Sequence, residues 1–346
     1  MISDLRVIDE PLDKWICRTC GLVSRREPPP HELYTSGYAL YAHAPGAPRE
    51  TARQRAYAAW IASQSGAPPR RVLDVGCGNG SLLTALMREW PATQMSGVDP
   101  SPESIAHARA AGIDARAGRR GDVAASVDMV ISVNVIEHTP DPAAFIEDAL
   151  AALVEDGELV LICPDAQHPW TELLIADHVW SFGPRHLIRL LENADLAVVS
   201  TSSAPAELGP LIMVRAARRQ RAKERMPSAP SAADGAGEKC RYLDAWRRMD
   251  ATLRERAPEG TLICFGIGEA AALLRAYTPD TWSRVDWCTA DDPERPTFGD
   301  LPVETYPGMA PSHILLGVRP PAQASVAARL LGDGHSVIRW DDLVAA

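Results

Sequence analysis

The sequence predicts an α/β protein: a doubly wound, Rossmann-like core with a short N-terminal segment before it and a second, smaller Rossmann-like α/β domain after it. Three observations support this prediction. Short apolar segments of strand type alternate with helical segments from residue 71, a glycine-rich turn joins the first strand to the first helix, and the same order returns near residue 261. Continuous apolar strands of this kind are typical of parallel sheets covered by helices on both faces.

Composition and charge narrow the classes of partner. At 346 residues, with 46% hydrophobic and 23% charged residues, the chain is long enough for two globular domains. The formal net charge of −10 argues against nucleic acid or an anionic membrane as the main partner. We find no apolar run of about 18 residues, and the charged start MISDLRVIDE does not fit a signal peptide. Seven scattered cysteines suit a reducing compartment, so we expect a cytoplasmic protein, and nothing indicates its oligomeric state.

Residues 1–48 are predicted to form an irregular N-terminal segment. Cys17 and Cys20 have the spacing of a zinc knuckle, which makes them candidate metal ligands. A tetrahedral zinc site needs four ligands, however, and no second C-x-x-C follows. His31 and His43 could complete the site only at unusual spacing. We therefore interpret the knuckle as degenerate and do not expect bound zinc.

Three tyrosines, Tyr34, Tyr38 and Tyr41, follow the two cysteines. They could form a lid over a bound cofactor, with Tyr38 in contact with it, or a surface loop whose aromatic side chains pack on the domain. The next segment, 49–64, is predicted to be a helix that leads into the first strand.

The core is organised around residues 71–80, RVLDVGCGNG, in which a short apolar strand runs into a glycine turn and then a helix. Glycines at alternate positions let the backbone turn tightly and approach a ligand closely, where a Cβ would interfere. The second strand ends at Asp99, about 20 residues after the turn, where a carboxylate can accept both hydroxyls of a ribose. The alternative is an ordinary strand–helix turn with buried glycines.

The glycine spacing distinguishes two kinds of cofactor. Dinucleotide folds use G-x-G-x-x-G to place a pyrophosphate at a helix N-terminus, whereas this chain has G-x-G-x-G preceded by Asp74. An acid at that position would repel a pyrophosphate but can pair with an ammonium group. S-adenosyl-L-methionine carries both an amino-acid end and a ribose, so it satisfies both Asp74 and Asp99.

At these residues the sequence resembles the class I S-adenosylmethionine-dependent methyltransferases, whose first motif is D-x-G-x-G-x-G. The resemblance implies that the turn glycines line the methionine end of the cofactor and that the acid after the second strand binds the ribose. With the tyrosine lid included, the residues predicted to bind the cofactor are Asp74, Gly76, Cys77, Gly78, Gly80, Asp99, Pro100, Asn134, Glu137 and Tyr38.

The remaining elements of the predicted core domain, 49–218, follow in regular order. Strands are expected at 71–75, 95–98, 127–135, 158–164, 196–203 and 211–218, and helices at 81–90, 102–110, 142–154 and 186–194. The last two strands correspond, by resemblance, to the closing pair of the methyltransferase fold. The ligand should lie across the carboxyl ends of the parallel strands.

After the core, residues 219–258 are predicted to be a linker followed by a helix over 241–256, and residues 259–346 a half-size Rossmann-like domain. The glycine turn of this domain, Gly266-Ile267-Gly268, lacks a third glycine, and Glu269 stands where a phosphate would bind. We therefore expect the domain to serve packing, oligomerisation or substrate cover rather than dinucleotide binding.

Two acid–histidine pairs are candidates for proton transfer. Glu137-His138 follows the fourth strand, and it could be catalytic or could shape the floor of the cofactor pocket. Asp177-His178 follows the fifth strand, where a neutral imidazole beside a carboxylate would suit proton removal near pH 7. The alternative for His178 is to cap the helix that begins near residue 184.

The second pair resembles the E-H pair of the sugar C-methyltransferases of deoxysugar pathways, in which the histidine is placed as the general base. The order of cysteine knuckle, tyrosine segment, core, acid–histidine pair and C-terminal α/β domain is similar to that family too. Asp291-Asp292-Pro293 and the stretch 295–302 match its C-terminal pattern loosely. Asp177 is shorter than the family's glutamate, and the family's tyrosine would fall on Ile175 or Ala176. The incomplete knuckle and the short length indicate that this chain resembles a divergent member.

We therefore predict an S-adenosylmethionine-dependent methyltransferase of a small polar metabolite, chiefly a nucleotide-linked sugar methylated at carbon or oxygen, in a biosynthetic pathway. His178, assisted by Asp177, would remove the substrate proton, with Glu137 and His138 lining the site. The alternatives are an O-methyltransferase of a quinone-like or natural-product phenol and a non-catalytic S-adenosylmethionine-binding protein. A nicotinamide-dependent oxidoreductase is disfavoured by the glycine spacing of both turns.

Overall fold

The structure is a computed structural model that describes residues 1–30, 34, 51–118, 127–219, 235–257, 259–293, 295–306 and 310–344. The chain forms two compact units. The larger unit comprises Lys14–His168 and Asp177–Ala233, and the smaller comprises Met1–Asp13, Pro169–Ala176 and Asp234–Ala346.

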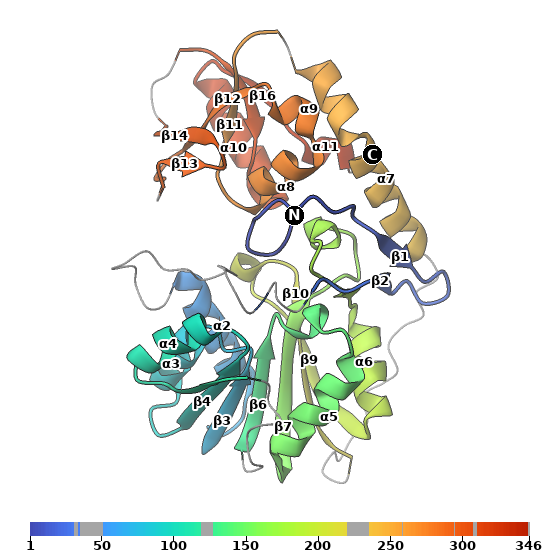
Figure 1. The fold of residues 1–346 in the computed structure, drawn as a ribbon, viewed down its shortest axis with the longest axis vertical. Helices are drawn as coiled ribbons and strands as arrows, with labels where there is room; N and C mark the ends of the chain where they lie inside the picture. Colours follow the sequence, from blue (N-terminus) through green and yellow to red (C-terminus); the bar gives the residue numbers. More distant parts are fainter. Residues whose placement is uncertain are drawn as a thin grey trace. The chain divides into compact units, whose positions relative to one another are not determined.

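In its described residues the larger unit contains a seven-stranded sheet of order β5-β4-β3-β6-β7-β10-β9 (Figure 1). Its strands are β3 Arg71–Val75, β4 Gln94–Asp99, β5 Asp114–Ala117, β6 Val127–Val133, β7 Leu153–Pro164, β9 Leu196–Ser203 and β10 Leu211–Arg218. The first five in this order are parallel, and β10 is antiparallel to both β7 and β9. This arrangement confirms the doubly wound core and its closing strand pair.

Helices cover both faces of this sheet. They are α2 Ala52–Gln64, α3 Ser81–Glu89, α4 Pro102–Ala110, α5 Pro142–Ala152 and α6 Pro184–Asn193. Alternate residues of β6 point to opposite faces: Met129 and Ile131 join the apolar core that includes α2, α3 and α4, whereas Val130 joins the core that includes α5 and α6. Burial on both faces explains why the parallel strands are continuous apolar runs.

Local signals set where these helices begin. Proline occupies the first position of both α4 and α5, where its missing N–H costs nothing. The side chain of Ser101 accepts a hydrogen bond from the backbone N–H of Ser104, and Asp141 accepts bonds from Ala143 and Ala144. These caps place the loops before α4 and α5 at the carboxyl edge of the sheet.

Three parts of the larger unit differ from the sequence prediction. Strand β5, DARA, was not predicted because its alanines and charged residues carry no strand signal. Strand β7 begins at Leu153, within the helix predicted over 142–154. The prediction of irregular structure fails for residues 14–25, which form β1 Lys14–Ile16 and β2 Val23–Arg25; these pair with β8 Trp180–Ser181 in a three-stranded sheet.

The smaller unit confirms the predicted second Rossmann-like domain. Its described residues form a six-stranded sheet of order β13-β14-β12-β11-β15-β16, parallel apart from the β13–β14 pair. The strands are β11 Leu262–Phe265, β12 Val285–Ala290, β13 Thr297–Phe298, β14 Leu301–Thr305, β15 His313–Leu316 and β16 Ser336–Ile338. The helices are α7 Gly235–Arg256, α8 Glu269–Tyr277, α9 Pro279–Trp282, α10 Pro320–Gly332 and α11 Asp341–Val344.

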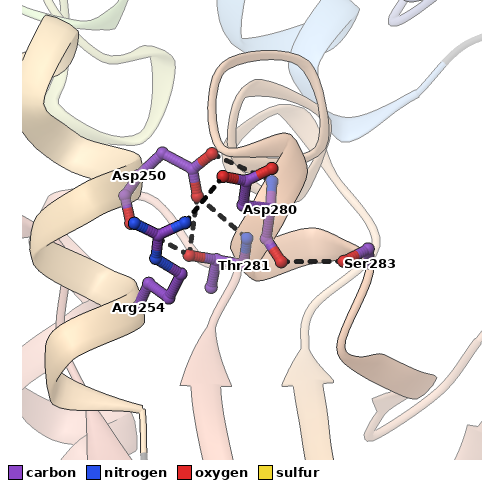
Figure 2. A network of polar contacts seen from close by, with 5 residues as sticks. All are labelled: Asp250, Arg254, Asp280, Thr281 and Ser283. Carbon is purple, nitrogen blue, oxygen red and sulfur yellow. Dashed lines mark hydrogen bonds and ion pairs between the residues drawn. The ribbon is translucent and has the colours of Figure 1, made fainter.

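A polar network joins α7 to α9 in this unit (Figure 2). The Asp250 carboxylate accepts hydrogen bonds from the backbone N–H groups of Asp280 and Thr281 and from the Thr281 hydroxyl. Arg254, one turn further along α7, pairs with Asp280 at 3.0 Å. The network satisfies the exposed amides at the start of α9, so we interpret it as structural.

The glycine turn of the smaller unit carries an acid where a phosphate would bind. Glu269 is the first residue of α8, and its Oε1 accepts a hydrogen bond from the Thr171 hydroxyl at 2.9 Å. A carboxylate at a helix N-terminus takes the place that an anionic ligand would otherwise occupy.

No helix among the described residues has the length and apolar character needed to cross a membrane.

Candidate functional site

The turn after β3 is built from glycines in the left-handed region. Gly76, Gly78 and Gly80 have φ values of 83°, 53° and 78°. A Cβ added to Gly76 would lie 2.3 Å from Cγ2 of Val135, in the loop after β6. The turn therefore needs glycine at Gly76 for two reasons: the backbone conformation and the closeness of the neighbouring loop.

Asp99 ends β4 beside this turn. Its Oδ2 accepts a hydrogen bond from the backbone N–H of Gly78 at 2.9 Å, and its Oδ1 accepts one from Ser101 at 2.8 Å. Burial raises the pKa of Asp99, and these two amides oppose the rise. An ionised carboxylate has about four acceptor positions, so two fixed amides orient it and leave capacity for a pair of ribose hydroxyls.

Asp74 lies near the end of β3 and is only 2% exposed. Its Oδ1 is buried and accepts no hydrogen bond from any described residue. Burial, followed by the negative charge of Asp99, raises the pKa of Asp74 to about 7. A buried acceptor of this kind is costly without a donor, and a cationic donor would bring the pKa down again.

The other predicted turn residues have packing roles in the structure. Cys77 is 7% exposed and belongs to the apolar core, and a Cβ on Gly97 of β4 would lie 2.5 Å from its Sγ. Pro100 is half-buried and joins Asp99 to Ser101, the N-cap of α4. Tyr38, the predicted lid contact, and Tyr41 lie outside the described residues, as do His31 and His43.

Asn134 follows β6 with a left-handed φ of 55°. Its Nδ2 donates a hydrogen bond to the Tyr57 hydroxyl of α2 at 3.1 Å, and Arg53 of the same helix donates to that hydroxyl at 3.0 Å. The sequence prediction included Asn134 but missed Arg53 and Tyr57. Their segment, ARQRAYAAW, carries no motif, and only its predicted place before the first strand could have drawn attention to it.

The structure brings the two acid–histidine pairs together. Glu137 and His138 lie on the short helix η2 Ile136–His138, and the rings of His138 and His178 are edge-to-face with centroids 4.8 Å apart. Glu137, Asp177 and His178 are 1%, 0% and 7% exposed. The predicted catalytic residues therefore form one buried cluster, although they follow different strands in the sequence.

Asp177 contacts His138 as well as preceding His178 in the chain. Nδ1 of His138 lies 2.9 Å from the backbone oxygen of Asp177 and 3.5 Å from its Oδ2. The Tyr34 hydroxyl donates to the same backbone oxygen at 3.3 Å. Because a carbonyl oxygen accepts, Nδ1 of His138 carries the proton and Nε2 carries the lone pair of the neutral ring.

Burial lowers the pKa of His138 to about 4, although the Asp177 carboxylate acts in the opposite direction. His138 is therefore neutral at pH 7. Lys14 donates a hydrogen bond to the backbone oxygen of His178 at 2.6 Å, which ties β1 to this cluster. The arrangement provides uncharged imidazole next to buried carboxylates, which suits proton acceptance from a substrate.

Two sets of residues have metal-ligating groups. Single ligand atoms of Glu137, His138 and His178 lie within 4.8 Å of one another, somewhat wider than the roughly 3.4 Å between ligands of a tetrahedral zinc ion. Cys17 and Cys20 form no disulfide, and the backbone amide of Cys20 is the main cause that lowers the pKa of the Cys17 thiol. In the described part of the chain, no third metal-type side chain joins these two cysteines.

A family model matches part of the chain, chiefly in the larger unit. Residues 49–201 match the family model of a methyltransferase domain. The matched range covers the structure from α2 to β9, so it includes the glycine turn, Asp99 and both acid–histidine pairs.

Curated relatives match over part of this domain. A ubiquinone biosynthesis O-methyltransferase of Xanthomonas campestris pv. campestris (strain B100) is 35% identical over 112 residues, which are 30% of this chain and 46% of that protein. A trans-aconitate 2-methyltransferase of Mycobacterium sp. (strain KMS) is 33% identical over 98 residues, 28% of this chain and 39% of that protein. The chain thus spans less than half the length of these relatives.

Solved structures resemble the core at low identity. A mitomycin 7-O-methyltransferase aligns over 48% of this chain and 53% of its own, with 19% identity and a TM-score of 0.42. The plantazolicin methyltransferase in complex with a monoazolic desmethylPZN analog and SAH aligns over 48% of this chain and 82% of its own, with 15% identity and a TM-score of 0.39.

Proposed function

We propose that this protein is an S-adenosylmethionine-dependent methyltransferase that acts on a small polar metabolite, and more specifically on a nucleotide-linked sugar, in a biosynthetic pathway of the cytoplasm. The observation that carries the proposal is the pair of carboxylates at one glycine turn. Asp74 presents a buried acceptor without a described donor, and Asp99 is oriented by two amides. The match of residues 49–201 to a methyltransferase domain supports it.

The residues at the turn fit the proposed cofactor. Asp74 offers an acceptor for an ammonium group and Asp99 offers acceptors for a ribose. Three glycines with left-handed backbone form the tight turn beside them. When bound, S-adenosylmethionine supplies an electrophilic methyl group on a positively charged sulfur. The chain's task is then to orient that group and to prepare a nucleophile.

The acid–histidine cluster provides the groups that prepare the nucleophile. In this proposal His178 takes the proton from an acidified C–H or an O–H of the acceptor, and the electron pair stays on the acceptor atom. Asp177 and His138 hold the surroundings of His178 in place, since Asp177 bonds His138 and the two rings are in edge-to-face contact. General-base catalysis of this kind is worth about 10²- to 10⁴-fold in rate.

The substrate class rests on the resemblance to deoxysugar C-methyltransferases, which extends to the second Rossmann-like unit. We propose that this unit covers the sugar nucleotide during the reaction. A second candidate is O-methylation of a quinone-like phenol. It is favoured by the 35% identical stretch shared with the ubiquinone biosynthesis O-methyltransferase.

Two measurements test the proposal. Calorimetry should show binding of S-adenosylmethionine and of its demethylated product, and Asp99→Ala should weaken it by about 100-fold or more, because several hydrogen bonds to a charged group are lost. No heat with either ligand would overturn the proposed function. Methyl transfer from labelled cofactor to a panel of nucleotide-linked sugars, and to quinone-like phenols, then separates the two acceptor classes.

A further inference from the structure

Residues 169–176, which we call the crossing segment, interrupt the larger unit. The larger unit includes the chain up to His168 and resumes at Asp177, whereas the crossing segment belongs to the smaller unit. The chain therefore returns to the larger unit immediately before His178, the residue that the proposed function assigns as the general base. Whatever holds the crossing segment bears on this base, because a single peptide bond joins the segment to Asp177.

Two side chains of α8 hold the crossing segment by hydrogen bonds. The segment contains the short helix η3 Thr171–Leu174. The Thr171 hydroxyl donates to Oε1 of Glu269 at 2.9 Å. The Tyr277 hydroxyl donates to the backbone oxygen of Leu174 at 2.5 Å. Because Glu269 and Tyr277 are the first and last residues of α8, both ends of η3 are fastened to one helix.

The crossing segment is buried as well as hydrogen-bonded. All four residues of η3 are buried, and so are Ile175 and Ala176. Tyr242 of α7 lies near the same place, because burial raises the pKa of its hydroxyl and the charges of Glu172 and Glu269 act in the same direction. Segments that are buried and hydrogen-bonded in this way do not open readily.

Residues of the larger unit hold the chain on the other side of this peptide bond. Nδ1 of His138 donates to the backbone oxygen of Asp177 at 2.9 Å, and Lys14 donates to the backbone oxygen of His178 at 2.6 Å. Leu174 and Asp177 are three residues apart, which is a span of about 11 Å at most. The backbone that carries the His178 imidazole is therefore tied on both sides within a few residues.

We propose that Thr171, Glu269 and Tyr277 are positioning residues for the general base and act through the crossing segment. They do so without contact to the methyl acceptor. The inference rests on the proposed role of His178 and gives the smaller unit a task beyond covering the substrate. A general base must lie within hydrogen-bond reach of the proton that it takes, and a misplacement of about 1 Å can lower a rate by about 100-fold.

A merely structural role makes a different prediction. If the two bonds only stabilise the smaller unit, their loss will disturb other parts of that unit, such as the buried His335, and leave His178 as it is. If they position the general base, their loss will change the surroundings of His178 and leave those of His335 unchanged.

The test follows the histidine rings by NMR in the full chain made with isotopically labelled histidine, and His178→Gln identifies the His178 signal. Thr171→Val removes one donor and Tyr277→Phe removes the other. Both variants should shift or broaden the His178 signal and leave the signals of His335 and of the exposed His107 in place. Thr171→Ser keeps the hydroxyl, so it is the matched control and should give the wild-type spectrum.

The same variants test the catalytic consequence. The nucleotide-linked sugars and quinone-like phenols of the acceptor panel serve as probes. Thr171→Val should lower kcat by about tenfold, as for the loss of a hydrogen bond to a charged group, and Thr171→Ser should restore it. Calorimetry should show the wild-type affinity for S-adenosylmethionine in both variants.

Other results overturn the inference in distinguishable ways. An unchanged His178 signal in both Thr171→Val and Tyr277→Phe shows that the crossing segment does not position the base, and an equal disturbance of His335 shows a structural role. An unchanged kcat in a variant whose His178 signal has moved also contradicts it. Failure of the wild type to bind S-adenosylmethionine would overturn the proposed function, whereas the NMR signals would still show whether the segment holds His178.

Discussion

Nδ1 of His138 donates to the backbone oxygen of Asp177 at 2.9 Å, and the Asp177 carboxylate lies 3.5 Å from the same nitrogen. The contact connects the loop after β6 to the loop after β7. It fixes which nitrogen of His138 is protonated and directs Nε2 away from Asp177. In the proposed function, the acceptor side of the site is therefore a pair of loops joined by a neutral histidine.

The first prediction concerns stability at acid pH. His138 has a pKa of about 4 in the folded chain, below the value near 6.5 of an exposed histidine. Between these pH values the unfolded chain binds more protons at this histidine than the folded chain does. The contribution of His138 to the free energy of unfolding is therefore fully present above about pH 6.5 and is lost as the pH drops towards 4. Protonation of this one group should lower the free energy of unfolding by about 3 kcal/mol at most.

Urea unfolding at pH 7 and at pH 4.5 measures this effect. His138→Gln cannot titrate, so it should lose less stability between these two pH values than the wild type. His107→Gln, at an exposed histidine, is the matched control for replacing an imidazole by an amide. Equal pH dependence in His138→Gln and the wild type would contradict a depressed pKa at His138.

The second prediction separates cofactor binding from chemistry. His178→Ala should bind S-adenosylmethionine as the wild type does but lose about 10²- to 10⁴-fold in the rate of methyl transfer, the range for loss of a general base. Single-turnover rates with labelled cofactor, alongside calorimetry, give both quantities. An unchanged rate would show that His178 is not the general base, and the assignment would pass to His138, whose Nε2 carries the lone pair.

The third prediction concerns metal. If imidazole is the base, treatment with a chelator should leave the rate unchanged. Added zinc should lower it, because the ligand atoms of Glu137, His138 and His178 lie within 4.8 Å of one another and a bound ion would occupy the lone pair of His178. Rates after dialysis against EDTA, with and without zinc, show this. A loss of activity on chelation that zinc restores would contradict the imidazole mechanism.

The sequence predicted the local geometry of the glycine turn far better than the contacts between the two acid–histidine pairs. Asp74, three glycines and Asp99 are close in the chain and belong to one strand–turn–helix–strand unit, so their spacing already encodes their geometry. The contact between His138 and Asp177 joins residues 39 positions apart, and it depends on how two loops pack. Arg53 is held by its bond to Tyr57, which also binds Asn134, and no local pattern distinguishes Arg53 from Arg55, the other arginine of α2. Short β5 escaped prediction because its pairing with β4, rather than its own residues, makes it a strand.

The last prediction tests why Gly76 must be glycine. Gly76 and Gly112 have nearly equal φ values, 83° and 84°. Alanine therefore meets the same backbone strain at both positions, about 1–2 kcal/mol. A Cβ at Gly112 has nothing within 4 Å, whereas a Cβ at Gly76 would be 2.3 Å from Val135. Gly76→Ala should therefore destabilise the chain by about 1–3 kcal/mol more than Gly112→Ala, the usual cost of overpacking.

Urea unfolding of the two variants gives the difference directly. Val135→Ala shortens the side chain that a Cβ would meet, so adding it to Gly76→Ala should recover part of the stability. It should recover less of the cofactor affinity, because the left-handed strain at the turn remains and displaces the backbone beside Asp74 and Gly78. If Gly76→Ala lowers the free energy of unfolding no more than Gly112→Ala does, the loop after β6 moves to accommodate the added methyl group. The closeness of Val135 then does not explain why residue 76 is glycine.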